Sequence, residues 1–180
     1  MVLSSLTEWY LDIETDGPDP RTNRILTIQY QRLVRGEPEG VFQVLAEWEW
    51  GEKQIVRTIV ERRLLEPTSE FVPVGTGLKD HIAFIIEKAE RYGVKEFSIE
   101  ELQRYWVQKP IIDLALADSG GGVSSGSAAR REQVVKLYRE GRYDDLIDLV
   151  TREKEEALPL IRETTHSRGV LSRPDWTVAP

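Results

Sequence analysis

Two acidic residues, Asp12 and Glu14, stand two positions apart in a segment that predicts a β-strand. Apolar residues alternate with them over residues 8–14, which is the period of two typical of a strand. Both carboxylates therefore project from one face, within reach of one or two cations. Phosphoryl transfer with two metal ions uses such acids to hold the ions, one of which activates water. The other interpretation of the pattern is a solvated strand face without a ligand.

The amino-acid composition limits the kinds of site and the metal ions that this chain could have. The chain has no cysteine, which excludes disulfides, zinc–thiolate sites and cysteine nucleophiles. It has two histidines, His81 and His166, so a metal would rest mainly on carboxylates, and this favours magnesium or manganese. The net charge of −7 argues against a protein that coats nucleic acid through positive charge. A nuclease remains compatible with that charge, because bound metal ions reverse the sign of an acidic site.

Length and hydrophobicity indicate one globular domain. The 180 residues suit a single core, and a composition of 40% hydrophobic and 31% charged residues is typical of a soluble chain. No apolar stretch reaches membrane-spanning length, and the N-terminus lacks the basic region of a signal peptide. We therefore expect a cytoplasmic protein without membrane contact, with one domain over residues 1–165 and a C-terminal tail over residues 166–180.

The strands and helices that the sequence predicts would form the framework that positions Asp12 and Glu14. Hydrophobic alternation predicts strands at residues 8–14, 24–34, 41–50 and, more briefly, 70–77. Helical spacing predicts helices at residues 52–65, 78–92, 98–108, 129–140 and 143–164. Ser98 and Glu101 form a capping box, and Pro159 either kinks or ends the last helix.

Two segments between these elements are less regular. Residues 109–117 fit either a helix or a short strand. The glycine- and serine-rich residues 119–128 predict a flexible loop, either a mobile lid or an exposed linker. The whole order indicates an α/β fold, in which a three-stranded antiparallel meander is extended by parallel strands into a mixed sheet covered by helices. This order resembles the ribonuclease-H-like arrangement.

Several stretches resemble one family more closely. LDIET followed by DGPDPRTNRILTIQYQ is similar to archaeal proteins related to the exonuclease domain of family-B DNA polymerases. FVPVGTGLKDHIAFIIEKAERYG resembles the second motif of that group, and KPIIDLALA a later segment. The resemblance covers roughly residues 8–165. It implies a 3′–5′ exonuclease-like protein of the DEDD type, in the ribonuclease-H-like superfamily, with two magnesium or manganese ions.

The second motif of that family supplies an acid at the start of a helix, after a turn. Here Gly75-Thr76-Gly77 leads to Asp80 and His81. By spacing, the position of the acid falls on His81, and Asp80 stands one residue early. Either Asp80 serves as the ligand, or His81 replaces it as a poorer magnesium ligand. Asp80 is also explained as a helix-start acid that interacts with the helix dipole.

The third motif should carry Tyr or His before an acid, and the best match is Leu149 to Glu153, with Leu in place of Tyr. Glu153 lies three and four residues from apolar positions of its helix, so it falls within the inward stripe. A carboxylate there needs a cation or hydrogen bonds. Without the Tyr or His that orients water, we expect a slow nuclease or an inactive relative.

Three further features have two interpretations each. Asp113 is a supporting acid or a helix cap, and the cap is favoured. Arg130 and Arg131 contact phosphates or form an ordinary helix surface, and the surface is favoured. Trp48 and Trp50 are expected to pack or to end a strand rather than to stack on bases.

The sequence as a whole favours a metal-dependent 3′–5′ exonuclease acting on the 3′ ends of DNA or RNA. Asp12, Glu14, Asp80 and Glu153 would bind two magnesium or manganese ions. The alternative is a catalytically inactive protein of the same fold that binds nucleic acid or serves as a scaffold subunit. Nucleic acid is the expected partner, and a protein partner in replication or repair is compatible with this interpretation. A third interpretation is an endonuclease on this fold, because fold does not fix the reaction.

Overall fold

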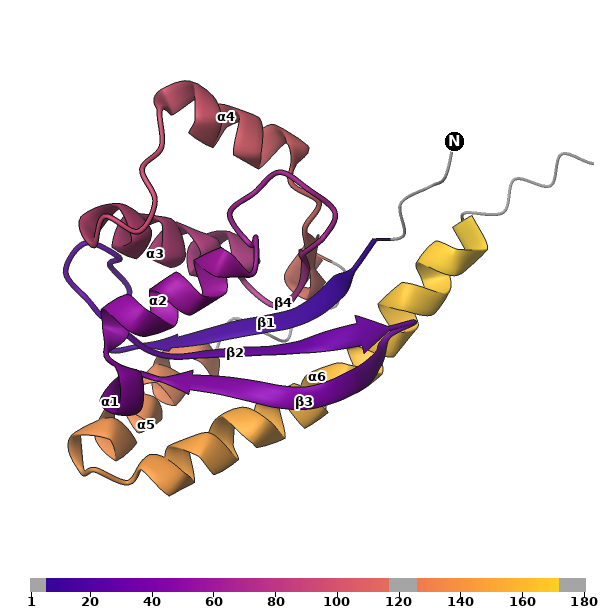
Figure 1. The fold of residues 1–180 in the computed structure, drawn as a ribbon. Coiled ribbons are helices and arrows are strands. Elements are labelled where there is room, and N and C mark those ends of the chain that lie inside the picture. Colours follow the sequence, from indigo (N-terminus) through magenta and orange to yellow (C-terminus); the bar gives the residue numbers. More distant parts are fainter. Residues whose placement is uncertain (1–5, 117–125, 172–180) are drawn as a thin grey trace, which may run out of the picture.

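A five-stranded mixed sheet lies at the centre of the computed structural model, which describes residues 6–116 and 126–171 (Figure 1). Its strands, in the order β3-β2-β1-β4-β5, are β1 (Glu8–Thr15), β2 (Ile25–Val34), β3 (Glu37–Ala46), β4 (Val72–Gly75) and β5 (Ile112–Asp113). The first three pair antiparallel, whereas β4 is parallel to β1 and β5 is parallel to β4. The predicted meander with a parallel extension is therefore confirmed.

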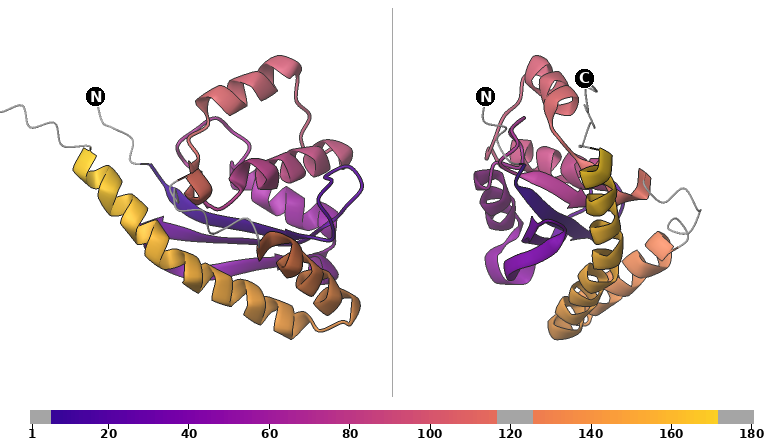
Figure 2. Two further views of the ribbon diagram at one scale, coloured as in Figure 1. Left: turned by 180° about the vertical axis from the view of Figure 1, so that it is seen from behind. Right: turned by 90° about the vertical axis from the view of Figure 1, so that its right-hand side faces the viewer.

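Helices cover both faces of the sheet (Figures 1 and 2). One face carries α2 (Glu52–Glu61), α3 (Leu78–Arg91) and, farther out, α4 (Ile99–Gln108). The other face carries α5 (Gly126–Arg139) and the long α6 (Tyr143–Leu171). The large apolar core lies on the α2–α3 face, and two smaller clusters lie beneath α5 and α6.

The central position of β1 explains how the acidic pair is presented. Leu11 and Ile13 are buried in the large core on the α2–α3 face. Because side chains alternate along a strand, Asp12 and Glu14 lie on the opposite face, toward α6. There they are opposite Gln29 and Thr27 of β2. The predicted period of two thus holds, and pairing with β2 along the whole segment, together with pairing to β4 up to Tyr10, fixes the backbone that carries the pair.

The predicted third strand ends early. Residues Glu47–Trp50 form a short helix, α1, so the prediction of a strand over residues 41–50 is wrong for its last four residues. Their alternation of Glu and Trp imitates a strand, but tertiary contacts decide the structure. Trp48 stacks on Tyr143 with 4.4 Å between ring centroids, and Glu47 accepts a hydrogen bond from the hydroxyl of Tyr138. Trp48 therefore packs, as expected, whereas Trp50 is 63% exposed and neither packs nor ends the strand.

Other boundaries follow the sequence closely. Ser98 and Glu101 form the predicted capping box at the start of α4, with hydrogen bonds of 2.8 and 3.1 Å. Residues 109–117 contain the two-residue β5 and a short 3-10 helix, Leu114–Leu116. Of the predicted loop, residues 126–128 already belong to α5, and residues 119–125 lie outside the described part of the chain.

Helix α6 continues through Pro159 to Leu171, so this proline does not end the helix. A proline inside a helix removes one backbone hydrogen bond and crowds the preceding turn. The neighbouring Leu158 and Ile161 are buried against the sheet, and this packing offsets the loss. The helix thus includes the first residues of the segment expected to be a tail. None of the helices in the described ranges is long and apolar enough to cross a membrane.

Candidate metal centre

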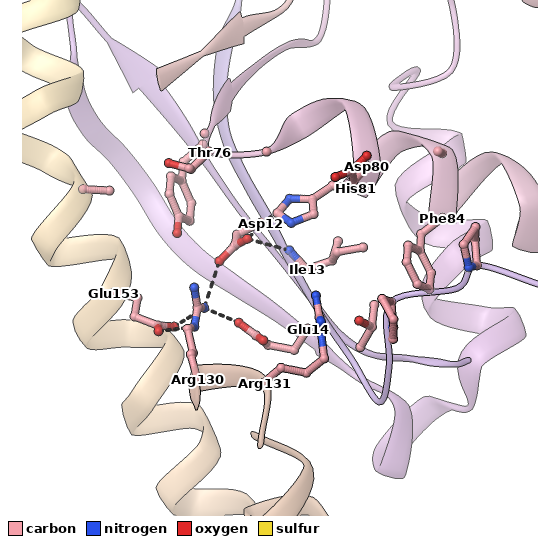
Figure 3. Close-up of a pocket in the computed structure, with 18 residues that line it drawn as sticks. Asp12, Ile13, Glu14, Thr76, Asp80, His81, Phe84, Arg130, Arg131 and Glu153 are labelled. Carbon is pink, nitrogen blue, oxygen red and sulfur yellow. Dashed lines mark hydrogen bonds and ion pairs between the residues drawn. The ribbon is translucent and has the colours of Figure 1, made fainter. Parts of the chain in front are cut away.

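Three carboxylates from distant parts of the chain meet on the α6 face of the sheet (Figure 3). Asp12 and Glu14 come from β1 and Glu153 comes from α6, and one oxygen of each lies within 4.8 Å of the others. Glu153 reaches this position because its helical stripe faces the sheet, as the spacing predicts. Asp12, Glu14 and Glu153 are therefore brought together as the sequence indicates.

The guanidinium of Arg130, from the start of α5, lies in the middle of these acids (Figure 3). Its Nη2 donates to Asp12 Oδ2 at 3.4 Å and also to carboxylate oxygens of Glu14 and Glu153. Its Nε forms an ion pair with the other oxygen of Glu153. The favoured interpretation of Arg130 as ordinary helix surface is wrong. Nothing in the pattern around Arg130 linked it to β1, because the contact depends on how α5 packs.

Burial and mutual repulsion shape the charges of this cluster. Burial and, next, the charge of Asp12 raise the pKa of Glu14 to about 8, against the opposing effect of Arg130. Burial likewise raises the pKa of Glu153 to about 7, against the attraction of Arg130. For Arg130, burial lowers the pKa, but the surrounding acids outweigh this and raise it above its usual value. One guanidinium thus compensates the three acids incompletely.

His81, rather than Asp80, lies against the acids. Its Nδ1 is 3.4 Å from Asp12 Oδ1 and is buried without a hydrogen-bond partner in the described residues. Burial lowers the pKa of His81, and Asp12 opposes this shift. Asp80 lines the same pocket, but it is exposed and lies outside the group of three acids. Successive residues of a helix point about 100° apart, so these two neighbours cannot both face β1.

Asp113 caps a helix, but not one that follows it in sequence. Its carboxylate accepts hydrogen bonds from the backbone N–H groups of Gly77 and Leu78, at 3.1 and 2.9 Å, at the start of α3. It also accepts one from Ala115 N at 3.0 Å. The cap interpretation is therefore confirmed. By holding the first turn of α3, Asp113 helps to position His81.

Leu149 occupies the position at which the third motif of the family would carry Tyr or His. Its side chain is buried against α5 and the sheet, in one of the smaller apolar clusters. Tyr10, which precedes Asp12 by two residues and shares its face, lines the pocket instead. Burial and the nearby Asp12 raise the pKa of Tyr10. The strand alternation placed Tyr10 on this face, but nothing in the sequence marked it as part of a pocket.

A pocket of about 570 Å³ opens over the acids. Arg131 and Thr76 contribute polar groups to its wall, and Phe84 with Pro18 and Pro20 contributes apolar surface. The volume lies in the range of small-molecule sites, roughly 300–1,000 Å³. The pocket therefore has room for part of a nucleotide.

No protein-family model matches the chain, and no curated protein matches it in sequence. The function must therefore be argued from the chemistry of this pocket.

Proposed function

We propose that the chain is a metal-dependent, 3′–5′ exonuclease-like nuclease of the ribonuclease-H-like class that hydrolyses phosphodiester bonds of DNA or RNA. The observation that supports this most is the convergence of Asp12, Glu14 and Glu153 to within 4.8 Å. Two acids on the central strand and one on a late helix are the arrangement that the resemblance implies. The strand order β3-β2-β1-β4-β5 also agrees with it.

The residues present fit a divalent cation. Carboxylate oxygens are the ligands that magnesium and manganese prefer, and the three acids offer them from a fixed strand and a packed helix. When bound, such a cation polarises the phosphoryl oxygen and lowers the pKa of bound water. Asp80, which is exposed on the wall of the same pocket, would be the further carboxylate available to a second cation.

The surrounding side chains suit a phosphodiester substrate. Arg131 lines the pocket beside the acids and supplies positive charge for a phosphate. His81 faces Asp12 from the side opposite Arg130 and helps to orient the Asp12 carboxylate. Pro18, which is exposed, and Pro20 offer an apolar surface at the pocket wall against which a nucleobase can pack. These groups bind and orient the substrate, and they do not by themselves select DNA over RNA.

A second candidate function is a catalytically inactive protein of the same fold, which binds nucleic acid or serves as a scaffold in replication or repair. Arg130 favours it, because a guanidinium already neutralises part of the acidic cluster. Leu149 favours it too, because the water-orienting Tyr or His of the family is replaced by a buried apolar side chain. In this function the ion pairs of Arg130 with the acids serve mainly to join β1, α5 and α6.

The two functions are separated by calorimetric titration of Mg²⁺ and Mn²⁺ into wild type, Asp12→Ala and Asp148→Ala. Asp148 is an exposed acid on α6 and serves as the control. A parallel assay follows degradation of single-stranded DNA and RNA labelled at either end. Cation binding and cleavage that vanish only in Asp12→Ala support the nuclease. Cation binding without cleavage supports the inactive protein, and cleavage that survives Asp12→Ala contradicts the site.

A further inference from the structure

We propose that Arg130 is a displaceable counter-ion, which neutralises Asp12, Glu14 and Glu153 until a divalent cation expels it. The inference rests on the proposed metal-dependent function and concerns how the same site is regulated. Arg130 bonds to all three acids through one guanidinium group. It thereby occupies the position that a shared cation would take.

Occupancy by Arg130 and by a cation exclude each other. The three carboxylate oxygens lie within 4.8 Å of one another, and the guanidinium fills the space between them. A cation bound to the same oxygens needs that space, and its charge repels the guanidinium at short range. Binding of the cation must therefore break the ion pairs of Arg130.

Arg130 is the member of this cluster that can move. Asp12 and Glu14 are fixed by the backbone of β1, which pairs with β2 and β4. Arg130 lies near the beginning of α5, whereas the residues that anchor this helix, Val134 and Leu137, come one and two turns later. The side chain of Arg130 is 34% exposed against 8% for Glu14, so it has a direct route to solvent.

The charges of the cluster favour the replacement of Arg130 by a divalent cation. Arg130 contributes one positive charge to three acids, whose oxygens lie within 4.8 Å of one another. A divalent cation brings twice the charge and accepts oxygen ligands from any direction. Arg130 therefore keeps the acids assembled without matching the strength of a cation.

The first test compares the Mn²⁺ affinity of wild type and Arg130→Gln by calorimetry. The variant removes the competitor, so we expect it to bind Mn²⁺ about tenfold or more tightly. Arg139→Gln, which changes an exposed arginine on the same helix, should bind as wild type does. Arg130→Lys keeps a charge but loses the forked geometry, and its affinity should fall between the two.

The second test uses wild-type protein, so that it decides even if Arg130→Gln fails to fold. The ¹⁵Nε signal of Arg130 is assigned by its loss in Arg130→Lys and followed during Mg²⁺ titration. We expect it to move to the position of exposed arginines as the site saturates. The signal of Arg139 should stay unchanged.

The outcomes separate this inference from the proposed function. Cation binding with equal affinity in wild type and Arg130→Gln, or with an unmoved Arg130 signal, overturns the displacement and leaves the nuclease standing. Absence of cation binding in every variant overturns both. Displacement of Arg130 without any cleavage supports the counter-ion and contradicts the nuclease.

Discussion

Asp12 on β1 and Glu153 on α6 hold carboxylate oxygens within 4.8 Å of each other, although they come from opposite ends of the chain. Neither residue could be placed there by local structure alone. The strand presents Asp12 toward α6, and the inward stripe of α6 presents Glu153 toward the strand. The packing of one helix on one sheet therefore assembles the candidate site.

Glu153→Gln should weaken Mn²⁺ binding at least about tenfold, the scale known for residues that merely support a metal ligand. The amide keeps the shape of the side chain but removes the charge that the cation needs. Calorimetry measures the affinity, with Glu163→Gln, an exposed acid on the same helix, as control. Unchanged affinity in Glu153→Gln would remove this residue from the site.

His81→Ala should weaken cation binding more than Asp80→Ala does. His81 Nδ1 lies 3.4 Å from Asp12 Oδ1, whereas Asp80 is exposed at the pocket wall. We expect a several-fold loss for His81→Ala and a smaller one for Asp80→Ala. The same titration checks both variants. A larger loss in Asp80→Ala would restore the acid that the second motif of the family implies.

Gly75→Ala should reduce both stability and cation affinity. A Cβ at Gly75 would overlap the carbonyl oxygen of Leu11, so β4 and β1 would have to separate next to Asp12. Overpacking of this kind costs about 1–3 kcal/mol of the free energy of unfolding. Urea denaturation measures the loss. Gly40→Ala, where a Cβ meets nothing within 4 Å, should keep the wild-type cation affinity even if its positive φ costs stability.

Lys109 should make stability depend on pH. It is buried and donates to three carbonyl oxygens of the loop between α2 and β4, with the shortest contact 2.8 Å from Glu66 O. Burial lowers its pKa from 10.5 to about 8, although Glu66 opposes the shift. Below pH 8 the lysine is protonated in both the folded and the unfolded chain.

Between pH 8 and 10.5 the folded chain loses the Lys109 proton while the unfolded chain keeps it. The free energy of unfolding should therefore rise with pH across this window, by at most about 1.4 kcal/mol per pH unit. Urea denaturation of wild type and Lys109→Met measures the effect, because Met lacks the titrating group. The same pH slope in both proteins would show that Lys109 does not titrate there.

The direction of a side chain could be predicted from the sequence wherever a pattern within one segment determines the structure. Alternation over residues 8–14 placed Asp12 and Glu14 on one face, and helical spacing placed Glu153 in the buried stripe. The capping box at Ser98 is a local motif of the same kind. In each case the period of the element fixes where the side chain points.

The predictions from sequence were wrong or incomplete where contacts between distant segments determine the structure. Residues 47–50 alternate like a strand, yet the packing of Trp48 on Tyr143 and Tyr138 accompanies a helix there. Arg130 resembles a surface residue until α5 docks beside β1. The turn before α3 left Asp80 and His81 as alternatives, because a shift of one residue decides which of them faces the strand.

The long α6 has a consequence for how the site comes into being. It covers Tyr10 and Val74 on the sheet through Leu158 and Ile161, and it also carries Glu153. A nascent chain that has emerged only as far as α5 has both acids of β1 but lacks the third. The acidic cluster therefore assembles only after α6 has been synthesised and has packed on the sheet, and a chain that stops before α6 cannot bring the three acids together.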